Sequence, residues 1–245
     1  GLPHQNTESI KTTIDTVLSL SPDRLALYHY AHLPHIFKPQ RRIDTNVVPD
    51  SEEKLDMLQY CVQTLTERGY VFIGMDHFAK PDDELSIALK EGFLQRNFQG
   101  YSTYADCDLV AIGVSSIGKI GSTYSQNERD IDTYYAALDA GHLPIMRGYQ
   151  LNQDDILRRN IIQDLMCRFS LDYRIYESVF GIPFSRYFAA ELEDMKQLET
   201  LGLVHLKPHG LTVTPKGRFL IRNIAMVFDY HLRHKETKAK YSQTV

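Results

Sequence analysis

The segment that sets the fold is residues 50–75, which read DSEEKLDMLQYCVQTLTERGYVFIGM. Asp50 with Glu53 three residues later forms a capping-box pattern, and apolar residues then recur at helical spacing up to Gly69, a residue type that commonly ends helices. The run from Tyr70 to Met75 is short and apolar, as buried strands are. The segment therefore predicts a helix that leads directly into a strand.

The same order recurs on both sides of this segment. A helix capped by Thr7 precedes an apolar strand over residues 25–30, and a helix over residues 82–91 precedes a strand over residues 108–112. Strands that alternate with helices are typical of an α/β protein with a parallel sheet or a (β/α) barrel. In such folds ligands bind at the carboxyl ends of the strands. That edge is expected to collect residues 29–35, 76–77 and 113–118.

The composition changes near Gln150. Helical periodicity is strong from Asp154 onward, a hairpin-like passage follows over residues 202–214, and a last helix runs from Gly217 to Phe228. This order resembles a winged-helix module. We therefore expect two domains, residues 1–149 and 150–245, the second mostly helical.

Bulk composition excludes several classes of protein. The chain has 245 residues, 43% of them hydrophobic, which suffices for a full core, and its net charge of −4 argues against coating nucleic acid or an anionic membrane. Nothing approaches the roughly 18 uninterrupted apolar residues of a membrane span. The cysteines Cys61, Cys107 and Cys167 lack metal-site or redox spacing, so they are interpreted as thiols in a reducing compartment. The expected location is the cytoplasm, without nucleic-acid or membrane partners.

The best candidate site is the run Arg96 to Thr103, which interleaves Asn, Gln, Tyr and Thr with Phe and Gly. Amides and hydroxyls are costly to bury unless something bonds them, so packing alone explains this run poorly. Residues 113–120 nearly match a phosphate-binding loop, but Ile120 stands where the hydroxyl that holds Mg²⁺ should be. His29, His32 and His35 have a spacing that would point them to different faces of a strand, so a metal site there is not favoured.

Several blocks together resemble one family, the oxygen-independent coproporphyrinogen III oxidases. The blocks are residues 22–25, 30–34, 40–43, 74–79, 96–101 and 217–224, which include Tyr30-Ala31-His32-Leu33-Pro34, Met75-Asp76-His77-Phe78-Ala79 and Asn97-Phe98-Gln99-Gly100-Tyr101. The resemblance runs from Gly1 to the C-terminus. It implies the second half of a partial (β/α) radical S-adenosylmethionine barrel, followed by a mostly helical, winged-helix-like domain.

The resemblance also implies a reaction and its cofactors. Two propionates of coproporphyrinogen III become vinyls, giving protoporphyrinogen IX, in a radical reaction that uses S-adenosylmethionine and a [4Fe–4S] cluster bound by a C-x-x-x-C-x-x-C motif. This chain contains no such cysteine triplet. We therefore expect a C-terminal half that is inactive by itself and carries no metal ligands.

The resemblance assigns roles to four residues. Ala31 and Ile117 correspond to contacts for S-adenosylmethionine, and Phe98 and Gln99 to positions implicated in activity. Charge matching, independently of the family, suggests Arg41, Arg42 and Arg96 as ligands of the substrate propionates. Two alternatives remain open: a haem-binding radical relative without oxidase activity, and a nucleic-acid-binding winged helix over residues 151–245, whose slight positive balance falls short of a basic patch.

Overall fold

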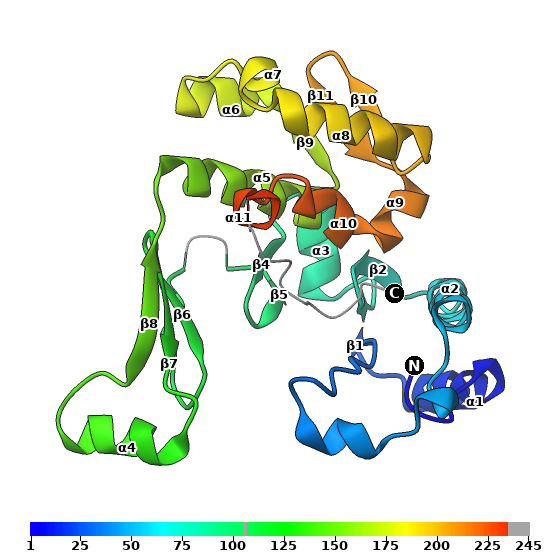
Figure 1. The fold of residues 1–245 in the computed structure, drawn as a ribbon. Helices are drawn as coiled ribbons and strands as arrows, with labels where there is room; N and C mark the ends of the chain where they lie inside the picture. The colour runs from blue at the N-terminus through cyan, green and yellow to red at the C-terminus, as the bar shows by residue number, and fades with distance from the viewer. Residues whose placement is uncertain (105–106, 235–245) are drawn as a thin grey trace.

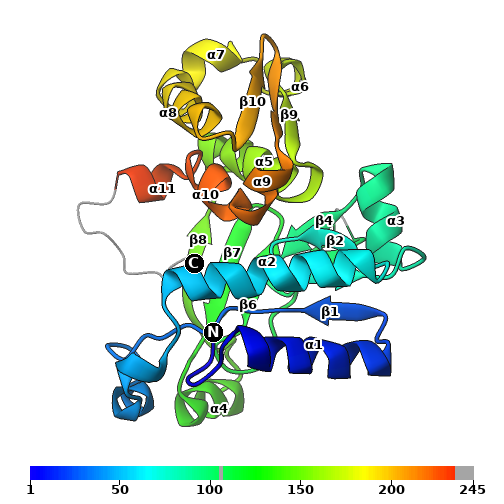
Figure 2. The same ribbon diagram turned by 90° about the vertical axis from the view of Figure 1, so that its right-hand side faces the viewer.

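The structure is a computed structural model that describes residues 1–104 and 107–234 (Figure 1). Its first part contains the helices α1 (Thr7–Leu20) and α2 (Ser51–Glu67), which lie side by side (Figure 2). The strands β1 (Arg24–Ala26), β2 (Val71–Gly74) and β3 (His77–Ala79) form a sheet in the order β1-β3-β2. Two 3₁₀ helices, Lys38–Arg42 and Thr45–Val47, lie between β1 and α2.

The helix predicted from residues 50–75 is confirmed as α2. Asp50 Oδ1 accepts a hydrogen bond from the backbone N–H of Glu53 at 2.9 Å, so it caps the helix and satisfies one of the unpaired N–H groups of the first turn. Leu65 of α2 is fully buried with Ile14 of α1 and Phe78 of β3 in a small core cluster. The apolar face of the helix therefore joins α1 to the sheet.

The predicted parallel arrangement is wrong for the described strands, all of which pair antiparallel. The decisive feature is a two-residue turn, Met75 and Asp76, that connects β2 directly to β3. Met75 has a left-handed backbone (φ 52°), as two-residue hairpins commonly require, and such a short connection can join only antiparallel strands. The predicted strand over residues 108–112 is also absent, apart from one bridge between Leu109 and Lys119.

Two hairpin-based units follow the first sheet. The helix α3 (Glu84–Glu91) leads to a hairpin of β4 (Gln95–Asn97) and β5 (Gly100–Ser102). The strands β6 (Ile117–Ile120), β7 (Thr123–Asn127) and β8 (Ile145–Gln150) then form a second sheet, with α4 (Ile131–Asp139) between β7 and β8. In Figure 1 this sheet and α4 extend on the left as an arm, and all six residues of β8 are exposed.

The C-terminal part is mostly helical and carries a three-stranded sheet of order β10-β11-β9. The hairpin predicted over residues 202–214 is confirmed as β10 and β11. The elements are α5 (Gln153–Arg168), β9 (Ser170–Asp172), α6 (Tyr173–Phe180), α7 (Phe184–Tyr187), α8 (Ala189–Thr200), β10 (Val204–Lys207), β11 (Gly210–Val213), α9 (Pro215–Phe219), α10 (Ile221–Met226) and α11 (Tyr230–Arg233). The mixed α/β class and the winged-helix-like C-terminal part are thus confirmed, whereas the sheets do not close into a barrel.

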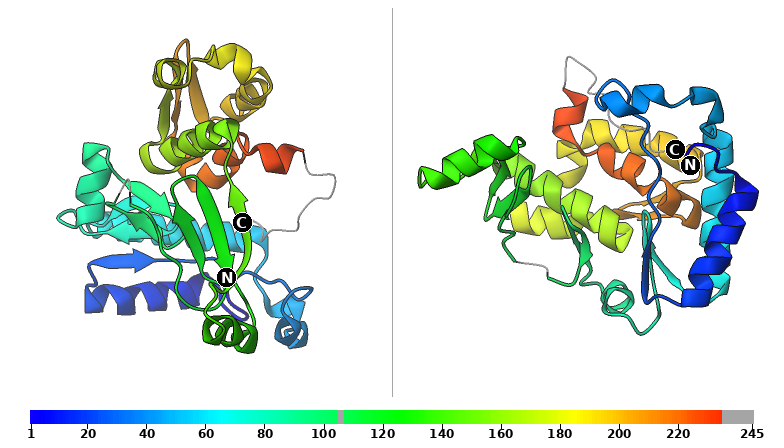
Figure 3. Two further views of the ribbon diagram at one scale, coloured as in Figure 1. Left: turned by 90° about the vertical axis from the view of Figure 1, so that its left-hand side faces the viewer. Right: turned by 90° about the horizontal axis from the view of Figure 1, so that it is seen from below.

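The larger core connects the two parts of the chain. Its buried side chains include Ile73, Leu94 and Tyr101 from the first part and Ile161 and Phe228 from the second. Figure 3 shows α5 and α10 close to the first part in both views, consistent with this shared core. The division at residues 149 and 150 stays a prediction, because one apolar cluster spans it.

Gly74 is required where β2 meets the β4–β5 hairpin. Its φ is +152°, and a Cβ there would lie 2.5 Å from the Tyr101 hydroxyl, which is buried and donates to the carbonyl of Met166 at 3.1 Å. We expect Gly74→Ala to lower the free energy of unfolding by about 1–3 kcal/mol through overpacking, in addition to its backbone cost. Gly69→Ala is the control, because Gly69 also has a positive φ (+88°) but nothing lies within 4 Å of its Cβ position. Equal losses for both variants in urea unfolding would contradict this account.

Candidate functional site

The largest candidate site is a cleft of about 570 Å³ between the β4–β5 hairpin, the strands β6 and β7, and the helix α5. We call it the hairpin cleft. Gln163 on α5 donates from Nε2 to Gln95 Oε1 on β4 at 2.8 Å, which fixes the helix against the hairpin. The cleft is lined by polar, aromatic and charged side chains: Gln95, Arg96, Asn97, Phe98, Ser102, Tyr104, Cys107, Asp108, Leu109, Lys119, Tyr124, Arg159, Asn160, Ile162 and Gln163.

The hairpin turn presents Phe98 and Gln99. Asn97 Oδ1 accepts a hydrogen bond from the backbone N–H of Gln99 at 2.8 Å, a local bond of the kind that Asn makes in turns. Phe98 is 54% exposed, and its ring meets the Tyr124 ring edge-on, with centroids 5.4 Å apart. Phe98 therefore leaves about half of a large aromatic side chain uncovered beside the cleft.

Arg96 on β4 and Tyr101 on β5 are paired directly across the hairpin. The Arg96 guanidinium lies 5.9 Å from the centroid of the Tyr101 ring, and burial raises the pKa of Tyr101, so that its phenol stays protonated. His77 also lies beside Tyr101, with 5.2 Å between the ring centroids, and the His77 Nδ1 is 2.6 Å from Asp76 Oδ1. The Asp76-His77 pair suggested by the sequence is therefore in contact and reaches the hairpin through Tyr101.

A second, smaller site lies where the first part meets the C-terminal helices. This interface cavity of about 220 Å³ is lined by Ala31, Met75 and Asp76 from the first part and by Arg222 and Asn223 from α10, among other residues. Gln40 Nε2 donates to the Ala31 carbonyl at 2.9 Å and fixes the backbone there. The cavity thus offers a carboxylate, a guanidinium and an amide beside Ala31.

The predicted site residues fall in three places. Phe98 and Arg96 line the hairpin cleft, with Gln99 in the same turn, whereas Ala31 lines the interface cavity. Ile117 begins β6 opposite Gln126, is partly buried and lines neither site. The roles of these residues stay predictions.

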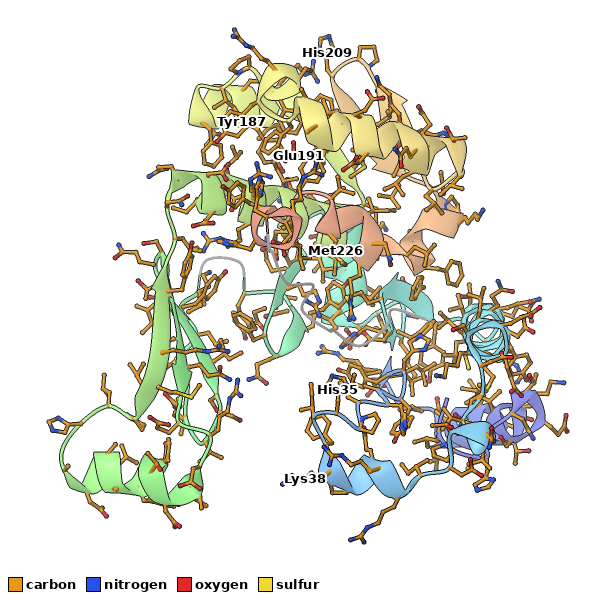
Figure 4. The ribbon with its side chains drawn as sticks, viewed as in Figure 1. His35, Lys38, Tyr187, Glu191, His209 and Met226 are labelled. Carbon is orange, nitrogen blue, oxygen red and sulfur yellow. The ribbon has the colours of Figure 1, made fainter. Side chains whose placement is uncertain are left out.

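Arg41 and Arg42 lie apart from both sites. They are exposed on the 3₁₀ helix Lys38–Arg42, and Arg41 donates from Nε to the Pro34 carbonyl at 2.8 Å. Figure 4 labels Lys38 at the start of this helix, below the first sheet and away from α5. The structure therefore does not bring Arg41 and Arg42 together with Arg96.

Sequence reasoning missed two cations of the hairpin cleft, Lys119 and Arg159. Lys119 lies in the segment 113–120, which nearly matches a phosphate-binding loop, so the sequence did indicate that this segment could contact a ligand. Arg159 is one of two consecutive arginines on α5, and no sequence pattern separates it from Arg158, which faces the core.

The cysteines do not form a cluster site in this chain. Burial raises the pKa of Cys61 to about 11 and that of Cys167 to about 12, while Cys107 is exposed. Within residues 1–104 and 107–234 no three His, Cys, Asp or Glu side chains come together as metal ligands. The described residues therefore do not fit a [4Fe–4S] cluster. In the same described parts of the chain, no helix is long and apolar enough to cross a membrane.

Comparison with known proteins supports a single family. The HemN C-terminal domain family matches residues 151–220. The oxygen-independent coproporphyrinogen III oxidase of Pseudomonas aeruginosa is 49% identical over 232 residues, which are 95% of this chain and 50% of the relative. The protein of the same name from Thermostichus vulcanus is 47% identical over 236 residues, 96% of this chain and 73% of the relative.

A solved structure matches equally well. It is described as "Coproporphyrinogen III oxidase (HemN) from Escherichia coli is a Radical SAM enzyme", and it superposes with a TM-score of 0.91 at 48% identity, over 95% of this chain and 54% of that one. The fold described above is thus that of part of a radical S-adenosylmethionine enzyme. This chain belongs to the oxygen-independent coproporphyrinogen III oxidase family. It spans about half the length of several relatives that it matches.

Proposed function

We propose that this chain forms the substrate-covering half of an oxygen-independent coproporphyrinogen III oxidase. The complete enzyme would convert two propionates of coproporphyrinogen III to vinyls, giving protoporphyrinogen IX, in anaerobic haem biosynthesis. The observation that carries the proposal is the match to the Escherichia coli structure, which extends over 95% of this chain at a TM-score of 0.91. We propose the cytoplasm as its location.

S-adenosylmethionine and a [4Fe–4S] cluster would supply the radical that takes hydrogen from each propionate. The cluster ligands would come from the part of the family that this chain does not match, so we propose that the chain is inactive alone. The interface cavity supports a role for Ala31 in holding S-adenosylmethionine, because Asp76 and Arg222 match the charges of its amino and carboxylate groups. Ile117 stays a proposed second contact.

Phe98 and Gln99 would contact the substrate. An exposed aromatic ring can lie against a pyrrole, and an amide can bond a carboxylate or a ribose hydroxyl. Apolar residues at the site entrance also help to exclude water, which protects a radical from side reactions. The hairpin cleft is therefore the proposed place of substrate contact.

The proposal is tested by growth. A chimera would join this chain to the part of the Pseudomonas aeruginosa relative that it does not match. We expect this chimera to restore anaerobic growth without added haem to a bacterial strain that lacks its own oxidase, whereas this chain alone should not. A chimera that binds haem but does not support growth would favour the haem-binding alternative.

A further inference from the structure

The hairpin cleft has an excess of positive charge. Arg96 comes from β4, Lys119 from β6 and Arg159 from α5, and Asp108 is the one carboxylate among the lining residues that the structure describes. Asp108 Oδ1 already accepts a hydrogen bond from the backbone N–H of Gly121 at 2.8 Å. Within the described residues none of the three cations forms an ion pair. Those parts of the chain therefore neutralise the positive charge of the cleft only in part.

Two nitrogens at this cleft also lack partners. Arg96 Nε and Arg159 Nη1 are buried and have no hydrogen-bond acceptor among residues 1–104 and 107–234. Buried donors without acceptors cost free energy, so native structures normally satisfy them with protein, water or ligand. Two such donors on arginines of the same cleft, from elements far apart in sequence, indicate a site built to receive an acceptor.

The rest of the lining is suited to an aromatic ring system. Phe98, Tyr104 and Tyr124 contribute rings, and Leu109 and Ile162 contribute aliphatic surface. A volume of about 570 Å³ is within the range of small-molecule sites, which are mostly apolar with a few placed polar groups. A ligand with a large apolar framework and several carboxylates matches both features.

We propose that the hairpin cleft binds the propionate side chains of a tetrapyrrole, and that Lys119 and Arg159 act with Arg96 as the carboxylate-binding residues. This inference rests on the proposed function and deepens it. It adds two cations that line the same cleft as Arg96 and Phe98, whereas Arg41 and Arg42 are exposed elsewhere and stay separate predictions. The arginines can grip a carboxylate with two parallel N–H donors, while Lys119 supplies a point charge.

The test is equilibrium binding of coproporphyrin III to this chain, with the fluorescence of the porphyrin as the signal. This oxidised form is stable and carries the same four propionates as the proposed substrate. We expect Lys119→Met and Arg159→Met each to weaken binding by roughly tenfold or more, as loss of a hydrogen bond to a charged group does. Lys207→Met, at an exposed position of β10, is the matched control and should leave binding unchanged.

Two further probes identify the chemistry that is recognised. The neutral tetramethyl ester of coproporphyrin should bind more weakly than the acid by at least the factor lost in either single variant, Lys119→Met or Arg159→Met. S-adenosylmethionine, which also carries a carboxylate, should not displace the porphyrin. Displacement would assign the cleft to the nucleoside and overturn the proposal.

Other outcomes also overturn it. Because the cleft lies within this chain, failure of the chain to bind the acid would contradict the proposal, as would binding that neither substitution weakens. Both substitutions should preserve the thermal unfolding midpoint, since neither side chain has an ion pair within the described residues. The growth test of the chimera is independent of these binding results. If the cleft does not bind the porphyrin but the chimera restores growth, only the cleft proposal is overturned and the proposed oxidase function is retained.

Discussion

Replacing Glu191 by alanine should lower the free energy of unfolding by about 3 kcal/mol, because it removes the more buried of the two carboxylates that pair with a buried arginine and leaves only Asp154 among the described residues. Arg158 Nη1 on α5 donates to Glu191 Oε1 on α8 at 2.8 Å, and the two side chains are only 11% and 7% exposed. Figure 4 labels Glu191 on α8, on the side that faces α5. The same arginine nitrogen also reaches the carbonyl of Phe228, which precedes α11.

The pKa of Arg158 reflects two opposing effects, burial of the guanidinium and its contacts with carboxylates. Burial by itself lowers this pKa, but the hydrogen bonds that the guanidinium donates to Glu191 and Asp154 outweigh it and raise the pKa overall. Arginine stays protonated in proteins, so the guanidinium keeps its charge when Glu191 is removed, and that charge is then balanced by Asp154 alone among the described residues. This is the reason for a loss far larger than a surface ion pair would give.

Glu193→Ala is the matched control on the same helix. Glu193 pairs with Lys196, but those side chains are 67% and 63% exposed, so the expected loss is below about 1 kcal/mol. Both variants are compared with the parent chain by urea unfolding at neutral pH. Losses of similar size for Glu191 and Glu193 would show that the buried pair does not hold α5 and α8 together.

The second large effect is expected on catalysis. In the chimera described above, Gln99→Ala should reduce turnover of coproporphyrinogen III by about a hundredfold or more, the scale of loss that follows when a positioning contact is removed. The side chain of Gln99 is exposed at the hairpin turn and makes no hydrogen bond within the described residues, so the substitution should not change stability. Turnover and the thermal midpoint are measured on the same preparation.

Gln197→Ala provides the control for this prediction. Gln197 is an exposed amide on α8, away from the hairpin cleft, and its removal should leave turnover unchanged. A companion variant, Phe98→Ala, should raise KM for the porphyrinogen because it removes the exposed aromatic surface beside Tyr124. If Gln99→Ala retained full turnover, the hairpin turn would not belong to the substrate site.

Local sequence signals predicted the helices well and the strand directions poorly. The capping residue Asp50 and the apolar spacing that follows it are properties of one segment, and they define α2 without reference to the rest of the chain. Strand direction depends instead on the length of the connection. The sequence Gly74-Met75-Asp76-His77 was interpreted as a strand end, whereas the positive φ of Gly74 and Met75 makes it a turn.

The candidate site was predictable only in part, for a similar reason. The polar and aromatic residues of 96–103 are contiguous, so the run could be singled out as a candidate site from composition, whereas its hairpin was not predicted and the role of Phe98 came from the family resemblance. Arg159 and Tyr124 reach the same cleft from distant segments, and only the packing of α5 and β7 brings them there. Arg41 and Arg42 are adjacent to each other in sequence but lie on an exposed 3₁₀ helix away from the hairpin cleft, and their role stays a prediction.

The central claim is that this chain supplies the substrate-covering half of the oxidase. The most direct test is anaerobic incubation of the chimera, loaded with its cluster and given S-adenosylmethionine and a reductant, with coproporphyrinogen III. Products are then identified by mass spectrometry. The account predicts the divinyl product, formed by two successive losses of CO₂ from propionates. Cleavage of S-adenosylmethionine with the porphyrinogen recovered intact would contradict it.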